Sequence, residues 1–202
     1  MSYLVFDTET TGLPDNYRLP STATDNWPRI VQIAWSLVDL EAGEIGPVTT
    51  YVVRPDDYTI PEGASRVHGI TTARALEEGL PAQDVLSSFL EAVGAADGLV
   101  AHNVGFDLPT VGAELVRLSG SDPLEGFTAL CIMEASTNYC ALPGKYGYKW
   151  PRLEELHWIL FQRGFEDAHD AGADVKAAGR CFVELVRRGV IGQRDLAFPA
   201  FG

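Results

Sequence analysis

Two acidic residues near the start of the chain stand at alternate positions, directly after an apolar run. The run extends from Leu4 to Phe6, and Asp7 and Glu9 follow it with one threonine between them. Residues i and i+2 of a strand point to the same side, so the two carboxylates should project together. Neighbouring carboxylates repel each other unless they share a proton or a cation, and a hard divalent cation satisfies them best. The pair therefore indicates either a metal site or a polar strand end before the turn at Gly12.

Two further acids and a histidine stand later in the chain. Asp107 comes shortly before Pro109, an order that is typical of the cap and first turn of a helix. Asp174 has helical spacing to a later apolar stripe, so its carboxylate should face the core and need a partner or a metal ion. The stripe consists of Ala178, Cys181, Phe182 and Leu185. His169 precedes this helix, and histidine is the residue type most often used as a general base, so it is either structural or a general base.

The pattern of apolar positions predicts the elements that hold these residues. Strands are expected at the N-terminus and at 29–40, 48–54, 98–102 and 127–133, and the first three read as an antiparallel meander. Helices are expected at 61–68, 72–79, 81–93, 107–118, 152–161 and 171–188. The long loop at 10–28 indicates a functional or mobile segment. This order predicts one α/β domain over residues 1–190, with helices on both faces of a mixed five-stranded sheet, and a short tail at 191–202.

Three segments together resemble the motifs of a known enzyme family. They are residues 6–13 (FDTETTGL), 101–107 (AHNVGFD) and 169–174 (HDAGAD). In order and spacing they are similar to the three exonuclease motifs of the DEDDh (DnaQ-like) 3′–5′ exonucleases, and the first resembles the DNA polymerase III epsilon-type group. The resemblance spans residue 3 to about residue 188. It implies a ribonuclease H-like fold with three antiparallel strands followed by parallel ones, in agreement with the elements predicted above.

The resemblance also implies a catalytic site of five residues. Asp7, Glu9 and Asp174 would hold one Mg²⁺ or Mn²⁺ ion, and Asp7 would bridge to a second ion that Asp107 supports. Two such ions, about 3.5–4 Å apart, clamp the scissile phosphate, while His169 would take the proton of the attacking water. The expected reaction releases nucleoside 5′-monophosphates from the 3′ end of single-stranded DNA, in proofreading or repair. An exoribonuclease of the same superfamily and a non-catalytic nucleic-acid-binding module are the alternatives.

Substrate-binding groups are expected around the motifs and in one later loop. Near the motifs they are Thr10, Leu13, His68, Asn103 and Phe106, each of which could instead be an ordinary packing residue. The loop at 143–152 is the basic, aromatic segment of the chain. Within it, Lys149 and Trp150 could contact a single strand, because bases stack on aromatic rings while cations meet phosphates. The alternative is a surface turn anchored by Trp150.

Composition bounds the class of protein. A chain of 202 residues suffices for one domain with a large core. The cysteines are three in number and form no CxxC motif, which fits a reducing compartment and supports neither a disulfide framework nor a zinc site. No apolar run approaches the roughly 20 residues of a membrane span, and no basic segment typical of a secretory signal opens the chain. We therefore expect a cytoplasmic protein without membrane contact.

The net charge of −13 opposes long-range attraction of nucleic acid. Either the protein acts on short or frayed single-stranded ends, with metal ions supplying local affinity, or a partner delivers it. The tail suggests such a partner, because Gln193, Leu196 and Phe198 fit the QxxLxF pattern of bacterial sliding-clamp ligands. A C-terminal segment that packs on its own domain is the alternative.

Overall fold

A mixed sheet forms the centre of the protein. The computed structural model describes residues 1–197, and its main sheet has six strands in the order β3-β2-β1-β5-β6, with β4 as a further partner of β2. The strands are β1 (Ser2–Thr10), β2 (Ile30–Asp39), β3 (Glu44–Ile45), β4 (Thr49–Val52), β5 (Gly98–Ala101) and β6 (Ala129–Cys131). β1 pairs antiparallel with β2 and parallel with β5. The predicted succession of antiparallel and then parallel strands is confirmed.

The count of five strands was one too low. The strand expected at 48–54 contains β4, whereas β3 precedes it and lies outside every expected strand; both pair with β2. Gly46 and Pro47 lie between them, and the backbone N–H of Gly46 donates to the carbonyl of Leu37 at 2.8 Å. Proline has no N–H to donate to the ladder. Pairing with β2 is therefore interrupted and resumes at Thr49.

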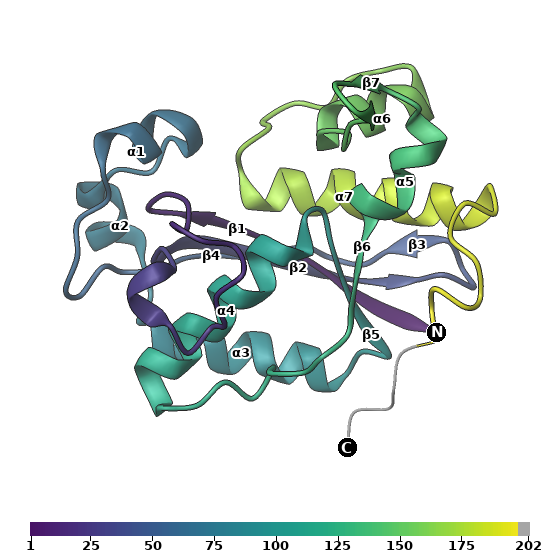
Figure 1. The fold of residues 1–202 in the computed structure, drawn as a ribbon. Helices are drawn as coiled ribbons and strands as arrows, with labels where there is room; N and C mark the ends of the chain where they lie inside the picture. The colour runs from purple at the N-terminus through teal and green to yellow at the C-terminus, as the bar shows by residue number, and fades with distance from the viewer. Residues whose placement is uncertain (198–202) are drawn as a thin grey trace.

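Helices cover both faces of the sheet (Figure 1). They are α1 (Glu62–His68), α2 (Thr72–Glu78), α3 (Ala82–Gly94), α4 (Val104–Ser119), α5 (Ile132–Cys140), α6 (Leu153–Phe161) and α7 (Ala171–Arg187). Leu4 and Phe6 of β1 pack in one core cluster with residues of α3 and α4. Tyr3 and Val5 pack in a second cluster with residues of α6 and α7. Alternate residues of β1 thus pack against the two helical layers on opposite faces of the sheet. Within residues 1–197, no helix has the length and apolar character that a membrane crossing requires.

The helix after β5 begins earlier than the sequence predicts. α4 starts at Val104, and Asn103 precedes it with a φ of 70°. Asparagine tolerates this left-handed conformation better than most residues. Asp107 is therefore not the helix cap. It lies in the first turn of α4 with an exposed fraction of only 2%, so its burial needs an explanation other than capping.

The long loop after β1 is held against α4. Arg117 of α4 donates to the carbonyls of Thr24 and Trp27 at 2.5 and 2.6 Å. The buried carboxylate of Glu114 accepts from the Arg29 guanidinium at 2.8 Å, at the end of the loop. The loop is thus tied at several points to the helix that carries Asp107.

Candidate active site

Three motif residues meet where the end of β1 approaches the start of α7. Glu9 stands on the same side of β1 as Tyr3 and Val5, which pack in the α7 layer. Ligand atoms of Glu9, His169 and Asp174 all lie within 4.8 Å of one another. Asp7 lines the same cavity as His169 and Asp174. The structure therefore brings together four of the five predicted catalytic residues on this face of the sheet.

The fifth residue, Asp107, reaches the site from the opposite helical layer. Its Oδ1 accepts hydrogen bonds from the backbone N–H and the hydroxyl of Thr8, at 3.0 and 2.8 Å. Thr8 lies between Asp7 and Glu9 on β1. One strand thus presents two carboxylates directly and holds a third through the threonine between them.

The pKa values of the four carboxyl groups are raised because the groups are buried close together. Burial is the largest cause in each case. It acts with repulsion from Asp107, Asp174 and Glu9 to raise the pKa of Asp7 well above its usual range. The pKa of Glu9 is raised to about 8 and that of Asp107 to about 7, although the hydrogen bonds from Thr8 oppose the latter shift.

Asp174 is the least shifted of the four. Burial raises its pKa to about 6, and the backbone N–H of His169, which donates to its Oδ2 at 3.1 Å, opposes the shift. Among residues 1–197, no lysine or arginine forms an ion pair with any of the four acids. Four converging carboxyl groups without a protein cation are a donor set that fits hard divalent cations.

His169 occupies a strained position in the loop before α7. Its φ is 71°, and Asp167 in the same loop has a φ of 59°. Histidine and aspartate are among the residues enriched in this region of backbone space. The imidazole is exposed, while the backbone N–H is fixed by Asp174. A ring with one side towards the acids and access to solvent is suited to taking up and releasing a proton.

Gln32 of β2 fastens the start of α7 to the sheet, a role that the sequence analysis did not anticipate. Its Nε2 donates to Oδ2 of Asp170 at 3.0 Å, and its Oε1 accepts from the backbone N–H of Ala171 at 2.9 Å. In the β1–β2 register Gln32 stands opposite Glu9. A glutamine within the apolar run at 30–35 was the available indication, because buried amides require partners.

Two cavities adjoin the acids. One has a volume of about 440 Å³ and is lined by Asp7, His169 and Asp174 together with Asn103 and Trp150. The other, of about 380 Å³, is lined by the segment from Thr8 to Leu13 and by residues of α1 and α4. Four of the predicted substrate-binding residues lie in this second cavity: Thr10, Leu13, His68 and Phe106.

Lys149 is the one predicted substrate-binding residue that lines neither of these two cavities. Its ammonium group pairs with Glu155 at 2.6 Å. The cavity of about 440 Å³ includes lining residues that the sequence analysis missed, among them Met133, Arg152 and Phe165. These come from segments distant in sequence, and only the folded chain assembles them.

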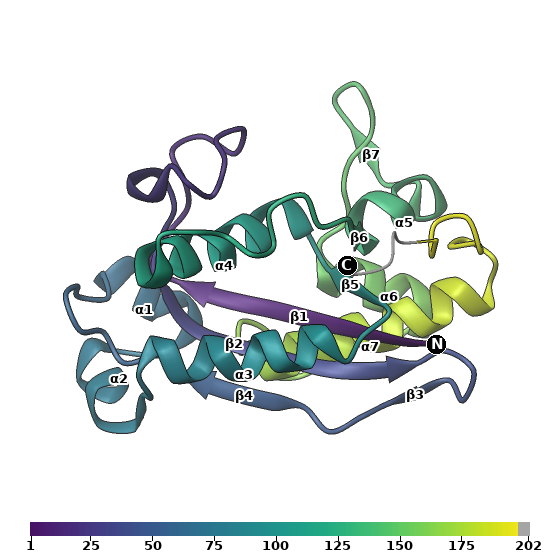
Figure 2. The same cartoon turned by 90° about the horizontal axis from the view of Figure 1, so that it is seen from below.

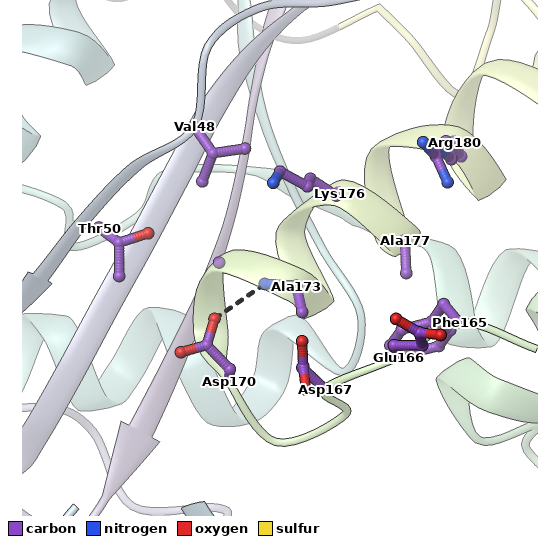
Figure 3. A pocket seen from close by; sticks show the side chains of 11 residues that line it. Val48, Thr50, Phe165, Glu166, Asp167, Asp170, Ala173, Lys176, Ala177 and Arg180 are labelled. Carbon is purple, nitrogen blue, oxygen red and sulfur yellow. Dashed lines mark hydrogen bonds between the residues drawn. The ribbon is translucent and has the colours of Figure 1, made fainter.

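A larger cavity, of about 640 Å³, lies on the other side of the loop that carries His169. Figure 3 shows Glu166, Asp167 and Asp170 of this loop facing it, with Lys176 and Arg180 of α7. None of the five motif residues lines it. Phe165 lines both this cavity and the one at the acids. The loop therefore separates the candidate active site from a mixed-charge cleft.

Several solved structures with a similar fold are exonucleases. The zinc-bound complex of E. coli exonuclease I with single-stranded DNA matches with a TM-score of 0.73 and 20% identity, over 96% of this chain and 42% of that chain. Exonuclease I from Methylocaldum szegediense matches with a TM-score of 0.71 and 23% identity, over 96% and 41%. Exonuclease X in complex with 5′-overhanging duplex DNA matches with a TM-score of 0.65 and 22% identity, over 96% and 97%.

These similarities establish the fold, which is the ribonuclease H-like fold of exonucleases. The chain spans about two fifths of the length of the exonuclease I structures it matches. No curated protein matches the chain significantly. The RNase_T family, described as exonuclease, matches residues 4–182. That span includes most of β1, all of α4, most of α7 and the loop before it, and hence all five motif residues. The chain therefore belongs to the RNase_T exonuclease family.

Proposed function

We propose that the protein is a metal-dependent 3′–5′ exonuclease that removes nucleoside 5′-monophosphates from single-stranded ends of DNA. The observation that carries the proposal is the convergence of four carboxyl groups without a protein cation, beside the exposed imidazole of His169. Family membership supports nuclease chemistry. The presence of single-stranded or overhanging DNA in the similar structures favours DNA as the substrate.

Asp7, Glu9 and Asp174 would hold one Mg²⁺ or Mn²⁺ ion, and Asp7 and Asp107 would hold a second. Bound there, two divalent ions would supply an activated water and stabilise the leaving oxygen of the phosphodiester. The backbone N–H and the hydroxyl of Thr8 donate to Oδ1 of Asp107, and these two hydrogen bonds fix the orientation of its carboxylate for this role. A ring nitrogen of His169 takes the proton of the attacking water and passes it to solvent.

The cavity of about 380 Å³ is proposed to hold the terminal nucleotide. Its lining combines the segment from Thr8 to Leu13 with His68 and Phe106. A lining of apolar residues with a few polar ones suits a base and a sugar. Asn103 and Trp150, which line the neighbouring cavity, would contact the next part of the strand.

Within the family, the form of the first motif favours the DEDDh, epsilon-type group, and a role in proofreading or repair. RNA remains the alternative substrate class. Sliding-clamp binding by the tail stays a prediction. Leu196 packs against the core cluster around α7, and its carbonyl accepts from the Tyr3 hydroxyl at 3.4 Å. Phe198 lies outside the described residues. The packing of Leu196 favours an internal role for this part of the tail.

A degradation panel tests the proposal. End-labelled single-stranded DNA, duplex DNA and single-stranded RNA are incubated with Mg²⁺, Mn²⁺ or EDTA. We expect stepwise shortening of 5′-labelled single-stranded DNA with either metal ion and none in EDTA. Asp7→Asn should abolish it, because this substitution removes a ligand shared by both ions. Shortening that persists in EDTA or in Asp7→Asn would contradict the proposal, and faster loss of RNA would favour the exoribonuclease alternative.

A further inference from the structure

Three aromatic rings are exposed on and beside one hairpin. β7 (Pro143–Gly144) and β8 (Gly147–Tyr148) form a small sheet of their own. The exposed fractions are 89% for Tyr146, 57% for Tyr148 and 61% for Trp150. Figure 2 shows the hairpin standing out from the body of the protein. Large aromatic side chains normally bury most of their surface, so a concentration of exposed rings indicates a contact surface.

The base of this hairpin is anchored. The backbone N–H of Lys149 donates to the carbonyl of Leu142 at 2.9 Å, and the Lys149 ammonium pairs with Glu155 of α6 at 2.6 Å. Nε2 of His102, at the end of β5, lies 3.1 Å from the carbonyl oxygen of Pro151. The hairpin that carries the rings is thus attached at its base to α6 and to the end of β5. This attachment lowers the entropy cost of binding a ligand through the rings.

The charge of the segment is opposite to that of the molecule. Residues 143–152 contain three cations and no acid, whereas the whole chain has a net charge of −13. Lys145 lies over the Tyr146 ring, 5.0 Å from its centroid. Within residues 1–197 neither Lys145 nor Arg152 forms an ion pair. Both cations are therefore free to meet an anionic chain.

The hairpin is continuous with the candidate active site. Trp150 and Arg152 line the same cavity as Asp7 and Asp174. A strand whose 3′ end lies at the acids can pass Trp150 and then reach the tip of the hairpin. Rings and cations that lie together along one segment suit a single strand of nucleic acid, since its bases stack and its phosphates are charged.

We propose that the β7–β8 hairpin is a second binding subsite, which holds the single-stranded DNA 5′ of the terminal nucleotide by stacking its bases on Tyr146 and Tyr148. This inference rests on the proposed function, because it places the 3′ end at the carboxylates. The subsite requires bases with free faces, so it discriminates against a fully paired duplex. It also supplies local affinity in a protein whose overall charge repels DNA.

Binding is the first test. The double variant Tyr146→Ala/Tyr148→Ala is compared with wild type for fluorescence anisotropy of a labelled oligothymidylate of about 20 nucleotides, in EDTA, where hydrolysis is stopped. We expect the Kd of the double variant to be about tenfold higher or more, from the loss of stacking. The control is Trp158→Ala, which removes a ring of 54% exposure from α6; it should leave the Kd unchanged. A wild-type protein that binds no more tightly than the double variant overturns the subsite.

Hydrolysis of a one-nucleotide substrate separates the two proposals. The p-nitrophenyl ester of thymidine 5′-monophosphate reaches the carboxylates but is too short for the hairpin. We expect its kcat/KM to be the same in wild type and the double variant, while the KM for the long oligothymidylate rises. A parallel loss on both substrates overturns the subsite. If neither substrate is hydrolysed but hairpin-dependent binding persists, the exonuclease proposal fails and the subsite stands.

Discussion

The pKa values of Glu9 and Asp107 place two site residues at the edge of protonation near neutral pH. Burial and neighbouring carboxylates raise them to about 8 and about 7. A carboxyl group must lose its proton before it binds a cation, so metal binding should release protons. Calorimetric titration of Mn²⁺ in buffers of different ionisation enthalpy should show proton release at pH 7 and tighter binding at pH 8 than at pH 6.5. An affinity that does not vary with pH would contradict these shifts.

His169 has two alternative roles, as a general base or as a metal ligand, because its ring nitrogen lies close to the carboxylate oxygens of Glu9 and Asp174. We expect His169→Asn to lower kcat by about 10²–10⁴-fold, the usual size of a general-base contribution, with little change in Mn²⁺ affinity. Asp167→Asn is the matched control, since Asp167 belongs to the same loop but faces the other cavity. A large loss of Mn²⁺ affinity in His169→Asn would assign the ring to the metal instead.

At the scale of elements, the site depends on how α7 is fastened to the sheet. Gln32 makes two hydrogen bonds across the start of this helix, to Asp170 and to Ala171. Gln32→Ala removes both and leaves buried polar groups without partners, so the free energy of unfolding should fall by about 1–3 kcal/mol. It should also lower kcat, because His169 and Asp174 flank the fastened residues.

Urea unfolding and steady-state kinetics measure these two effects. Gln83→Ala is the control, since Gln83 makes only an exposed hydrogen bond to Ser87 within α3. A Gln32→Ala protein as stable and as active as wild type would show that α7 needs no such fastening.

Local patterns account for what the sequence predicts well. β1 and α7 follow from the periods of their apolar residues, and the carboxylates of Asp7 and Glu9 are separated by a single residue. The helix α5 was not expected, because the strand expected at 127–133 ends at Cys131 and a helix follows it directly. The other failures are of two kinds. The two-residue strand β3 and the early start of α4 are short local features that a periodic pattern does not register. The contacts of Gln32 with the start of α7 join residues 138 and 139 positions apart, and such partners are set by tertiary packing.

At the scale of the whole molecule, the negative net charge opposes the binding of DNA that the proposed function requires. The net charge of −13 includes four acids that belong to the site, and hence a bound pair of divalent ions would leave −9. Long-range attraction of DNA is then weak, and affinity must come from contacts at short range. The basic hairpin and the metal ions are the two sources of it that the chain provides. Both act only after an end of the strand has reached the site, which favours free single-stranded ends over internal regions of a duplex.

The same acids make the stability of the metal-free protein depend on pH. Glu9 and Asp107 ionise near pH 8 and pH 7 when folded but near pH 4 when unfolded. The folded state therefore holds more protons between these values, and its stability falls as pH rises. Burial lowers the pKa of His102 to about 4 and also lowers the pKa values of His68 and His157; these histidines have the opposite effect, which fades as the pH rises past about 6.5. From pH 6.5 to 8 the carboxyl groups have the larger effect on the free energy of unfolding.

We expect the free energy of unfolding in EDTA to fall by about 1–3 kcal/mol between pH 6.5 and pH 8. Mn²⁺ should oppose the fall, because a cation that binds only the folded state stabilises it, and more so where its ligands are ionised. Thermal and urea unfolding at the two pH values, with EDTA or Mn²⁺, measure both effects. The double variant Glu9→Gln/Asp107→Asn should lose the part of the pH dependence that these two groups supply and respond less to Mn²⁺, while Asp7, whose pKa burial also raises, keeps its own part. If stability in EDTA instead rose towards pH 8, these carboxyl groups would be ionised in the folded protein without a metal ion, and a protein cation would have to balance them.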